Sequence, residues 1–536
     1  MTLLREPWQL VVKKKKALQE EALSAGIQHQ YDFVTEEIPL MTDAREIVGA
    51  IERGQTTARN VTQAFIHRAV QTHRNTNCLT EIAFTNALER ANELDDYVQR
   101  NGKVAGPLHG VPITMKDQFN VKGLDTTLGY VGRAFDPATK SAVLVDILES
   151  LGAIIIAKSN IPQSIMWCET DNPLWGRTTN PRKSSYTPGG STGGEAVLLS
   201  CDASILGWGT DIGGSIRIPA HMMGLYGLKP STQSARLPYR GVPVSTEGQE
   251  HVPSSVGPMA RSMETLTVAT KYVIDAQPWK MDPRCVPIPW RAELYDEMLD
   301  RPLTVGVLLD DGVVQPHPPI SRVLKNAIEL LRSAGHDIIL WNATLHQECI
   351  EVMDRFYTAD GGEDIKTSIS KGGEPLIPHV ESLVGSAEPI SVYEYWQLNR
   401  GKIALQQAYL DKWAAIRSPK TGHQADVLLM PPMPHSAVPH GGCRWVGYTK
   451  VWNLLDYPAL VIPGGTVCTE DVHEAVTSDY RNPLDKWNKD LWQTHKKEMA
   501  DLHMPVGLQL VCPKLEEEKV LSVGKTLTQL LQRNQS

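Results

Sequence analysis

Residues 188–195 read PGGSTGGE, and residues 209–219 read GTDIGGSIRIP. Each segment places a serine directly after a Gly-Gly pair, Ser191 in the first and Ser215 in the second. Glycine beside a serine lets the backbone turn tightly, and it leaves main-chain N–H groups free to face a developing negative charge. Two such loops so close together predict an acyl-transfer site.

A segment upstream of these loops supplies a candidate base. Residues 106–117 read GPLHGVPITMKD, and the apolar run 111–114 predicts a strand that delivers Lys116. A serine hydroxyl is a weak nucleophile until a base removes its proton, and neither glycine loop contains a histidine. A lysine can serve as that base when burial disfavours its charged form. Lys116 is therefore the candidate base.

Together the three segments resemble the amidase signature family of serine hydrolases. The resemblance extends from about Asp43 to the C-terminus. It continues through IPQS at 161–164, WNLLDYPA at 452–459 and PVGLQLV at 505–511. Within the family, the segments CET at 168–170, LPY at 237–239 and DGG at 360–362 resemble the fungal acetamidase branch.

The resemblance implies an α/β fold. We expect a mixed central β-sheet covered by helices on both faces, with a helical N-terminal part. Residues 1–42 are expected to form an N-terminal arm, and residues 43–536 a single large domain. Nothing in the chain repeats internally, and no low-complexity linker divides it.

Hydrophobic periodicity places the elements independently of the resemblance. It predicts strands at 111–114, 153–157, 303–309, 337–341, 427–430, 459–463 and 507–511. It predicts helices at 43–53, 58–73, 86–100, 141–151, 323–334 and 516–531, and a first helix that ends near Ala25. The stretch 273–302 is rich in Pro, Trp and charge, which indicates a surface excursion. The lysine run 13–16 is interpreted as the solvated face of the first helix.

The resemblance also assigns catalytic roles. Ser215 would attack the amide carbonyl, Ser191 would pass the proton, and neutral Lys116 would be the final base. In the family, a cis peptide bond precedes the bridging serine, here at Gly190. The oxyanion hole would consist of backbone N–H groups, namely those of Ile212, Gly213, Gly214 and Ser215. Thr192 departs from the serine that many members carry at its position.

Residues around the triad receive structural or binding roles. By position in the family, the substrate pocket would include Ile165, Met166 and Trp167, with Tyr357 and Asp360 as further candidates. We expect Asp211 and Arg217 to pair and hold the nucleophile loop rigid. Cys168 has no partnering motif, so we interpret it as a buried small hydrophobe.

Other functions remain open at this point. Residues 189–193 match the G-x-S-x-G nucleophile elbow, which would make Ser191 the nucleophile, but residues 180–188 are polar rather than strand-like. The triad is also found in aminoacyl-tRNA amidotransferase subunits, which deliver ammonia to a partner. A fold-retaining binding module is a third class. The leading interpretation is hydrolysis of a small aliphatic or aromatic primary amide; an amidase for a larger, pathway-specific amide is its alternative.

Composition narrows the partners and cofactors. The 536 residues are 41% hydrophobic with a net charge of −8, which gives no reason to expect nucleic acid. The eight cysteines form no C-x-x-C pair, and neither H-E-x-x-H nor G-x-x-x-x-G-K-[ST] occurs, so no metal or cofactor is expected. Scattered thiols without a secretory or membrane-spanning segment favour the cytoplasm. The resemblance also implies a homodimer.

Overall fold

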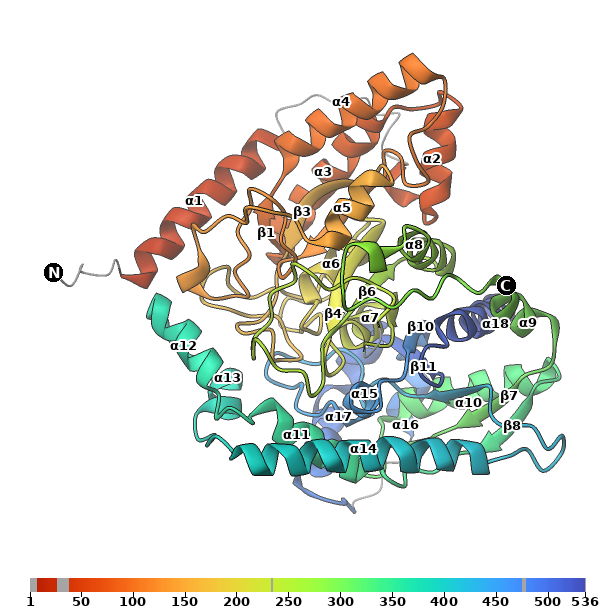
Figure 1. Ribbon diagram of the computed structural model, residues 1–536. Helices are drawn as coiled ribbons and strands as arrows, with labels where there is room; N and C mark the ends of the chain where they lie inside the picture. Colours follow the sequence, from red (N-terminus) through yellow and green to blue (C-terminus); the bar gives the residue numbers. More distant parts are fainter. Residues whose placement is uncertain (1–6, 27–37, 233–234, 475–478, 536) are drawn as a thin grey trace.

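A mixed β-sheet forms the centre of the computed structural model, which describes residues 7–26, 38–232, 235–474 and 479–535 (Figure 1). Within these residues the sheet has 11 strands in the order β1-β3-β2-β4-β6-β5-β10-β11-β9-β7-β8. The strands are β1 (Leu79–Ile82), β2 (Pro112–Lys116), β3 (Ile154–Ser159), β4 (Leu206–Asp211), β5 (Tyr226–Lys229), β6 (Ser255–Ala260), β7 (Thr304–Val307), β8 (Asp337–Leu340), β9 (Val427–Met430), β10 (Ala459–Thr466) and β11 (Pro505–Val511).

Helices cover both faces of this sheet, as the resemblance predicted (Figure 1). Those of the first half are α1 (Trp8–Gly26), α2 (Ala44–Glu52), α3 (Ala58–Thr76), α4 (Phe84–Asn101), α5 (Val143–Ser150), α6 (Gly193–Ser200), α7 (Arg217–Met223) and α8 (Met263–Asp275). Those of the second half are α9 (Ala292–Asp300), α10 (Pro318–Ser333), α11 (His346–Tyr357), α12 (Glu363–Gly372), α13 (Pro378–Val384), α14 (Val392–Ala415), α15 (Gly447–Leu454), α16 (Thr469–His473), α17 (Pro483–Asp501) and α18 (Glu517–Gln535). Short 3₁₀ turns are η2 (Ile38–Leu40), η3 (Val131–Arg133) and η4 (Pro278–Lys280).

Two parallel strands in this sheet position the predicted base. β2 lies between β3 and β4 and is parallel to both, with Ile113 opposite Leu206 and Met115 opposite Trp208. Every residue of β2 and β4 is buried. Because parallel strands end at the same edge of a sheet, the end of β2 at Lys116 lies beside the end of β4 at Asp211.

The sequence pattern predicts that the lysine run 13–16 is the solvated face of the first helix, but one of these lysines is buried. Lys15 of α1 is buried, and its Nζ forms ion pairs with Glu81 Oε1 and Asp125 Oδ2, both at 2.7 Å. Lys13 and Lys16 are exposed, as predicted. Apolar residues of α1, Trp8 among them, pack beside Lys15 on a cluster around Trp175. A run of four lysines therefore contains one that faces the protein and binds two carboxylates.

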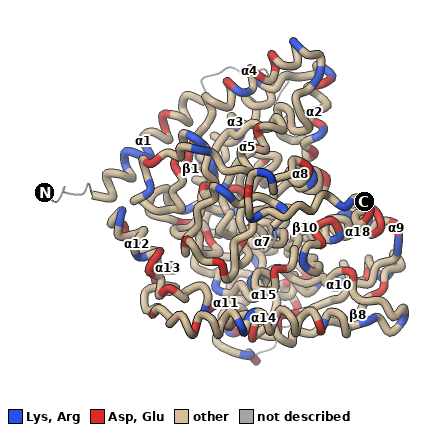
Figure 2. Tube along the Cα trace, in the orientation of Figure 1, with Lys and Arg blue, Asp and Glu red and all other residues tan. Residues whose placement is uncertain are grey.

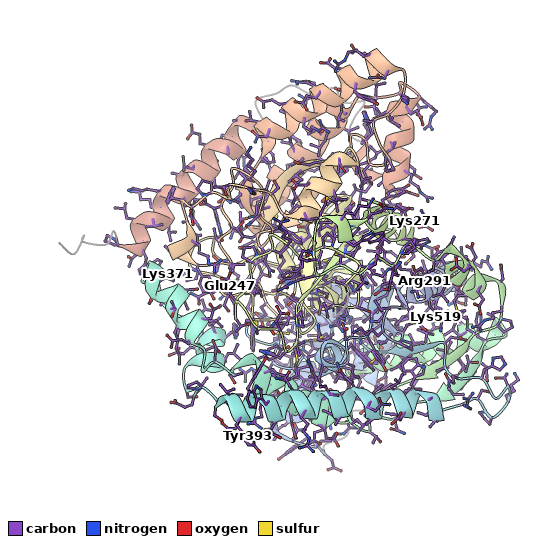
Figure 3. All side chains as sticks on the ribbon, in the orientation of Figure 1. Glu247, Lys271, Arg291, Lys371, Tyr393 and Lys519 are labelled. Atoms are coloured by element: carbon purple, nitrogen blue, oxygen red, sulfur yellow. The ribbon has the colours of Figure 1, made fainter. Side chains whose placement is uncertain are left out.

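The stretch 273–302 is mostly exposed or half-buried, as expected of a surface excursion, but it also contains regular structure. It contains the end of α8, the turn η4 and helix α9, which packs against α18. Arg291 at the start of α9 donates to Glu518 of α18 over 2.8 Å, and Figure 3 places Arg291 and Lys519 at this junction. Arg236 binds Glu517 and Glu518 from the other side, so a buried ionic cluster holds the C-terminal helix on the body.

Charge is mixed along the outer helices. Figure 2 shows basic and acidic segments interspersed on α1, α4 and α14. No helix within the described ranges has the length and apolar character needed to cross a bilayer.

Candidate active site

The Lys116 amine lies at the centre of the site. Lys116 is the last residue of β2 and is fully buried. Its Nζ lies 2.7 Å from Ser191 Oγ, 2.8 Å from Thr210 Oγ1 and 3.4 Å from the Thr210 carbonyl oxygen. Burial lowers the pKa of Lys116 to about 7, with Asp211 and Asp117 opposing that shift. A large fraction of this lysine is therefore neutral near neutral pH.

The two glycine loops bring their serines to this amine and to the pocket. The Gly190–Ser191 peptide bond is cis, as the resemblance implied, and α6 begins two residues after Ser191. The Thr192 N–H donates to the Ser215 carbonyl oxygen over 3.1 Å, which ties the loops together. No strand of the described chain leads into Ser191, so the structure lacks the strand that a nucleophile elbow requires.

The two serines differ in how much of each is exposed to solvent. Ser215 is 9% exposed and lines a pocket, whereas Ser191 is 1% exposed and Lys116 is fully buried. Among the described residues, no hydrogen bond joins the Ser191 and Ser215 hydroxyls. Catalytic hydrogen bonds are often long without substrate and tighten when it binds. A ligand in the pocket therefore reaches Ser215 first, with Ser191 and Lys116 behind it.

Hydrogen bonds that its carbonyl groups accept hold the backbone of the second loop in place. The Thr449 hydroxyl donates to Gly213 O over 2.6 Å, and the Tyr357 hydroxyl donates to Ile212 O over 3.3 Å. The Gly214 N–H donates to Asp211 Oδ1 over 2.8 Å, so it is already occupied, in contrast to its expected role facing the oxyanion. Within the described residues, the N–H groups of Ile212, Gly213 and Ser215 have no hydrogen-bond partner.

Asp211 and Arg217 form the expected pair below this loop, and both side chains are fully buried. Arg217 uses all five donors: two bonds reach Asp211 and the others reach Thr449 O, Gln509 Oε1 and Asn453 Oδ1. Burial alone would raise the pKa of Asp211, but the Arg217 guanidinium holds it well below its usual range. The pair therefore stays charged and holds the loop rigid.

A pocket of about 300 Å³ opens onto Ser215. Its apolar wall contains the predicted residues Ile165, Met166, Trp167 and Tyr357. The remaining lining residues are Cys168, Gly190, Ile212, Gly213, Ile218, Asp354, Leu383, Arg444, Trp445, Val446, Lys450 and Leu484. The pocket is thus largely apolar around Ser215 and carries a few charged side chains.

Asp360 and Cys168 are two further residues that the sequence analysis singled out. Asp360 does not line the pocket; its carboxylate accepts from the N–H groups of Gly362 and Asp364 at the start of α12. Cys168 is buried, as expected, and lines the pocket with its Sγ donating to Cys443 O over 3.3 Å.

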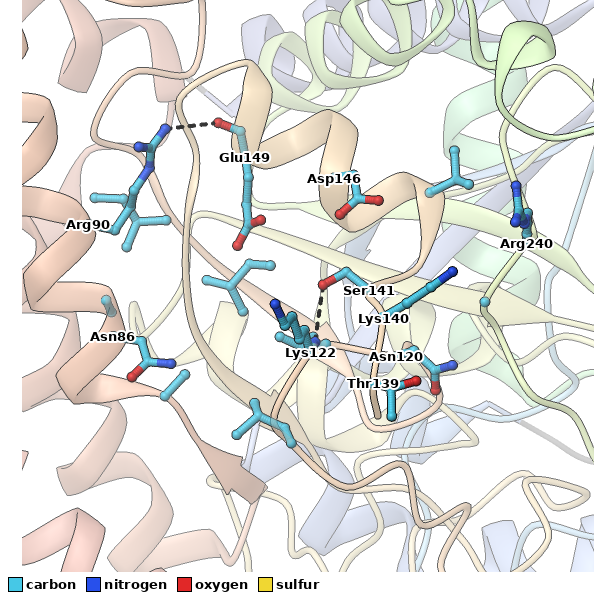
Figure 4. A pocket seen from close by; sticks show the side chains of 18 residues that line it. Asn86, Arg90, Asn120, Lys122, Thr139, Lys140, Ser141, Asp146, Glu149 and Arg240 are labelled. Atoms are coloured by element: carbon cyan, nitrogen blue, oxygen red, sulfur yellow. Dashed lines mark hydrogen bonds between the residues drawn. The ribbon is translucent and has the colours of Figure 1, made fainter. Parts of the chain in front are cut away.

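A larger cavity of about 790 Å³ lies away from these serines, between α4 and α5 (Figure 4). Figure 4 shows that its polar lining mixes Arg90, Lys122, Lys140 and Arg240 with Asp146 and Glu149. It contains none of the predicted catalytic residues. In the described part of the chain, no group of three or more His, Cys, Asp and Glu side chains is placed to hold a metal ion.

Sequence reasoning missed the residues that contact Lys116 from β4. Thr210 lies one residue before Asp211, and its hydroxyl donates to Gln118 Oε1 over 2.6 Å. It also missed the Lys450–Asp354 ion pair in the pocket wall. Position in or next to a recognised motif was the only available signal: Thr210 lies within the segment 209–219, and Gln118 follows Lys116 by two residues.

Known proteins resemble this chain over most of its length. Residues 60–521 match the family model described as Amidase. The chain is 49% identical over 526 residues to Amidase 1 of Gibberella moniliformis, covering 98% of this chain and 99% of that protein. It is 36% identical over 502 residues to Acetamidase of Emericella nidulans, covering 91% and 89%. The solved structure of Fatty acid amide hydrolase has a TM-score of 0.83 at 31% identity, covering 99% of this chain and 91% of that one. The chain therefore belongs to the amidase signature family of amide-hydrolysing enzymes.

Proposed function

We propose that this enzyme hydrolyses a primary amide through an acyl-enzyme on Ser215. The Ser215 oxygen bonds to the amide carbon while its proton passes to Ser191, whose own proton passes to the Lys116 amine. The same path returns a proton to the leaving nitrogen as the C–N bond breaks, which releases ammonia. Water then attacks the acyl-enzyme with the same proton path and releases the carboxylate.

One observation carries this proposal: a buried lysine amine in hydrogen-bonding contact with a serine that is itself shielded from the pocket. The Lys116 Nζ–Ser191 Oγ distance is 2.7 Å, and Ser215 is the more exposed of the two serines. A group that accepts protons but is not reached by substrate suits a relay, whereas a group on the pocket wall suits a nucleophile. These features support Ser215 as the attacking residue.

The N–H groups of the second loop that have no partner among the described residues offer a binding place for the oxyanion of the tetrahedral intermediate. Ile212, Gly213 and Ser215 offer donors beside the nucleophile, and the Gly213 and Ile212 carbonyl groups are held by Thr449 and Tyr357. Donors fixed before the reaction stabilise the tetrahedral intermediate without reorganisation, and each one typically contributes about 3–4 kcal/mol.

The substrate we propose is a primary amide with an apolar aliphatic or aromatic acyl group. The pocket of about 300 Å³ has room for more than an acetyl group, and Ile165, Met166 and Trp167 form an apolar wall. A ring or a short alkyl chain would bury its surface there. Relatives named acetamidase support an amide of modest size.

The test is ammonia release from the purified protein with acetamide, hexanamide, benzamide and phenylacetamide. We expect release that Ser215→Ala abolishes and that Ser191→Ala reduces to a residual level. Thr246→Ala, at a site outside the pocket, is the control. Ser215→Ala with the activity of the parent would overturn the assignment. Fluorophosphonate labelling without release from any of the four amides would contradict the substrate class and leave the nucleophile in place.

A further inference from the structure

The Lys116 amine has a defined set of partners on its side away from the serines. Its Nζ lies 2.8 Å from Thr210 Oγ1, and Thr210 Oγ1 lies 2.6 Å from Gln118 Oε1. Gln118 is fully buried, and its Nε2 donates to the Tyr239 hydroxyl over 3.4 Å. A chain of hydrogen bonds therefore runs from Tyr239 through Gln118 and Thr210 to the amine.

The number of protons on each group determines which atom donates in every hydrogen bond of this chain. The Gln118 amide oxygen can only accept, so the single Thr210 hydroxyl proton is used for that bond. Thr210 Oγ1 can then only accept from Lys116, and so can the Thr210 carbonyl oxygen at 3.4 Å. A neutral amine has two N–H bonds and one lone pair. With both N–H bonds directed at Thr210, the lone pair remains for the third contact, Ser191 Oγ at 2.7 Å.

We infer that Gln118 is a positioning residue: by holding the Thr210 hydroxyl proton, it directs the Lys116 lone pair toward Ser191. The inference rests on the proposed role of Lys116 as the base. Gln118 does not line the substrate pocket, so it acts only through Thr210 and Lys116. Without the amide oxygen, the Thr210 hydroxyl rotates and donates to the Lys116 lone pair, where it competes with Ser191.

The titratable groups near the amine are held by partners other than Gln118. Asp117 follows Lys116 in sequence, and its carboxylate accepts from the Thr127 and Leu128 N–H groups. Asp211 at the end of β4 is paired with Arg217. Glu195 of α6 accepts from Ser159, the residue opposite Lys116 on β3. Burial raises the pKa of Glu195 to about 7 as well. None of these groups is hydrogen-bonded to the Gln118 side chain, so they are common to the parent and the variants, and a difference between their pH profiles is attributed to residue 118.

The experiment measures the pH profile of kcat/KM and the rate of fluorophosphonate labelling for two variants of nearly equal size. Gln118→Leu removes the acceptor, and we expect kcat/KM and the labelling rate to fall about tenfold or more with KM nearly unchanged. Gln118→Glu keeps an acceptor oxygen and adds negative charge, which stabilises the ammonium form of Lys116. We expect its acid limb to move to higher pH.

Thr210 provides the matched pair if Gln118→Leu does not fold. Thr210→Ser keeps the hydroxyl and should retain activity near that of the parent, whereas Thr210→Val should lose about as much as Gln118→Leu. Folded Gln118→Leu with the labelling rate of the parent, or Gln118→Glu with an unshifted acid limb, would overturn the inference. Undiminished hydrolysis by Lys116→Met would instead show that Lys116 is not the base. That result would overturn the proposed function itself, so it is distinguishable from a failure of the inference about Gln118 alone.

Discussion

Burial of the Lys116 amine determines how activity varies with pH. Its pKa is lowered from 10.5 to about 7, and the proposed base acts only when neutral. The neutral fraction grows as pH rises, so kcat/KM should increase through about pH 7 and level off above it. Initial rates of ammonia release across a buffer series measure this. A maximum near pH ~5 would contradict a lysine base, because even buried lysines rarely titrate so low.

Arg217 is expected to be one of the residues whose loss most destabilises the protein. Arg217→Met leaves the fully buried Asp211 carboxylate without its cation, which typically costs about 3–5 kcal/mol. Lys271→Met is the control, since it removes an exposed ion pair with Asp275 and should change stability by about 0.5 kcal/mol or less. Denaturant unfolding at pH 7 measures both. Equal losses in the two variants would contradict the role given to the buried pair.

The serine and lysine positions were readable from sequence because glycine-rich loops keep their residues in a fixed local order. Ile165, Met166 and Trp167 were assigned to the pocket by their position in the family, and they line the pocket at Ser215. Thr210 and Gln118 were not predicted, because their contact depends on the register between two parallel strands. That register is a long-range property, and no local pattern around either residue reports it.

Helix α1 should depend on one buried lysine for its attachment. Lys15→Met leaves Glu81 and Asp125 without their shared cation, so we expect a loss of about 3 kcal/mol or more in the free energy of unfolding. Lys13→Met on the exposed face of the same helix should have almost no effect. Thermal unfolding of the full chain measures the difference. Matching melting temperatures for the two variants would contradict this attachment.

Strands were predictable where apolar residues run without interruption. The runs at 427–430 and 459–463 correspond to β9 and to the first part of β10. β4 and β6 were missed, because Gly207 and Gly209 interrupt the first and Gly257 and Pro258 the second. Those glycines are required by close packing: a Cβ on Gly207 would lie 2.1 Å from Glu195 Oε1. Gly207, which interrupts the apolar run of β4, thus makes room for Glu195 of α6 on the sheet, and Gly257 makes room for the Leu228 carbonyl of β5.

We also predict the oligomeric state of the protein. The resemblance implies a homodimer, and the long helix α14 presents Val392, Tyr393, Trp396, Ile403 and Leu410 to solvent. Figure 3 shows Tyr393 on the outer side of this helix. We expect sedimentation of the purified protein at micromolar concentration to give twice the mass of one chain. A single-chain mass that does not change with concentration would contradict the homodimer.

The proposed reacting groups and much of the pocket wall come from different parts of the chain. Lys116, Ser191 and Ser215 lie within one stretch, whereas Asp354, Tyr357 and residues 444–450 reach the pocket from the second half. Exchanging residues 354–450 with those of a relative would therefore replace one side of the pocket, while Ile165, Met166 and Trp167 on the other side and the reacting groups keep their sequence.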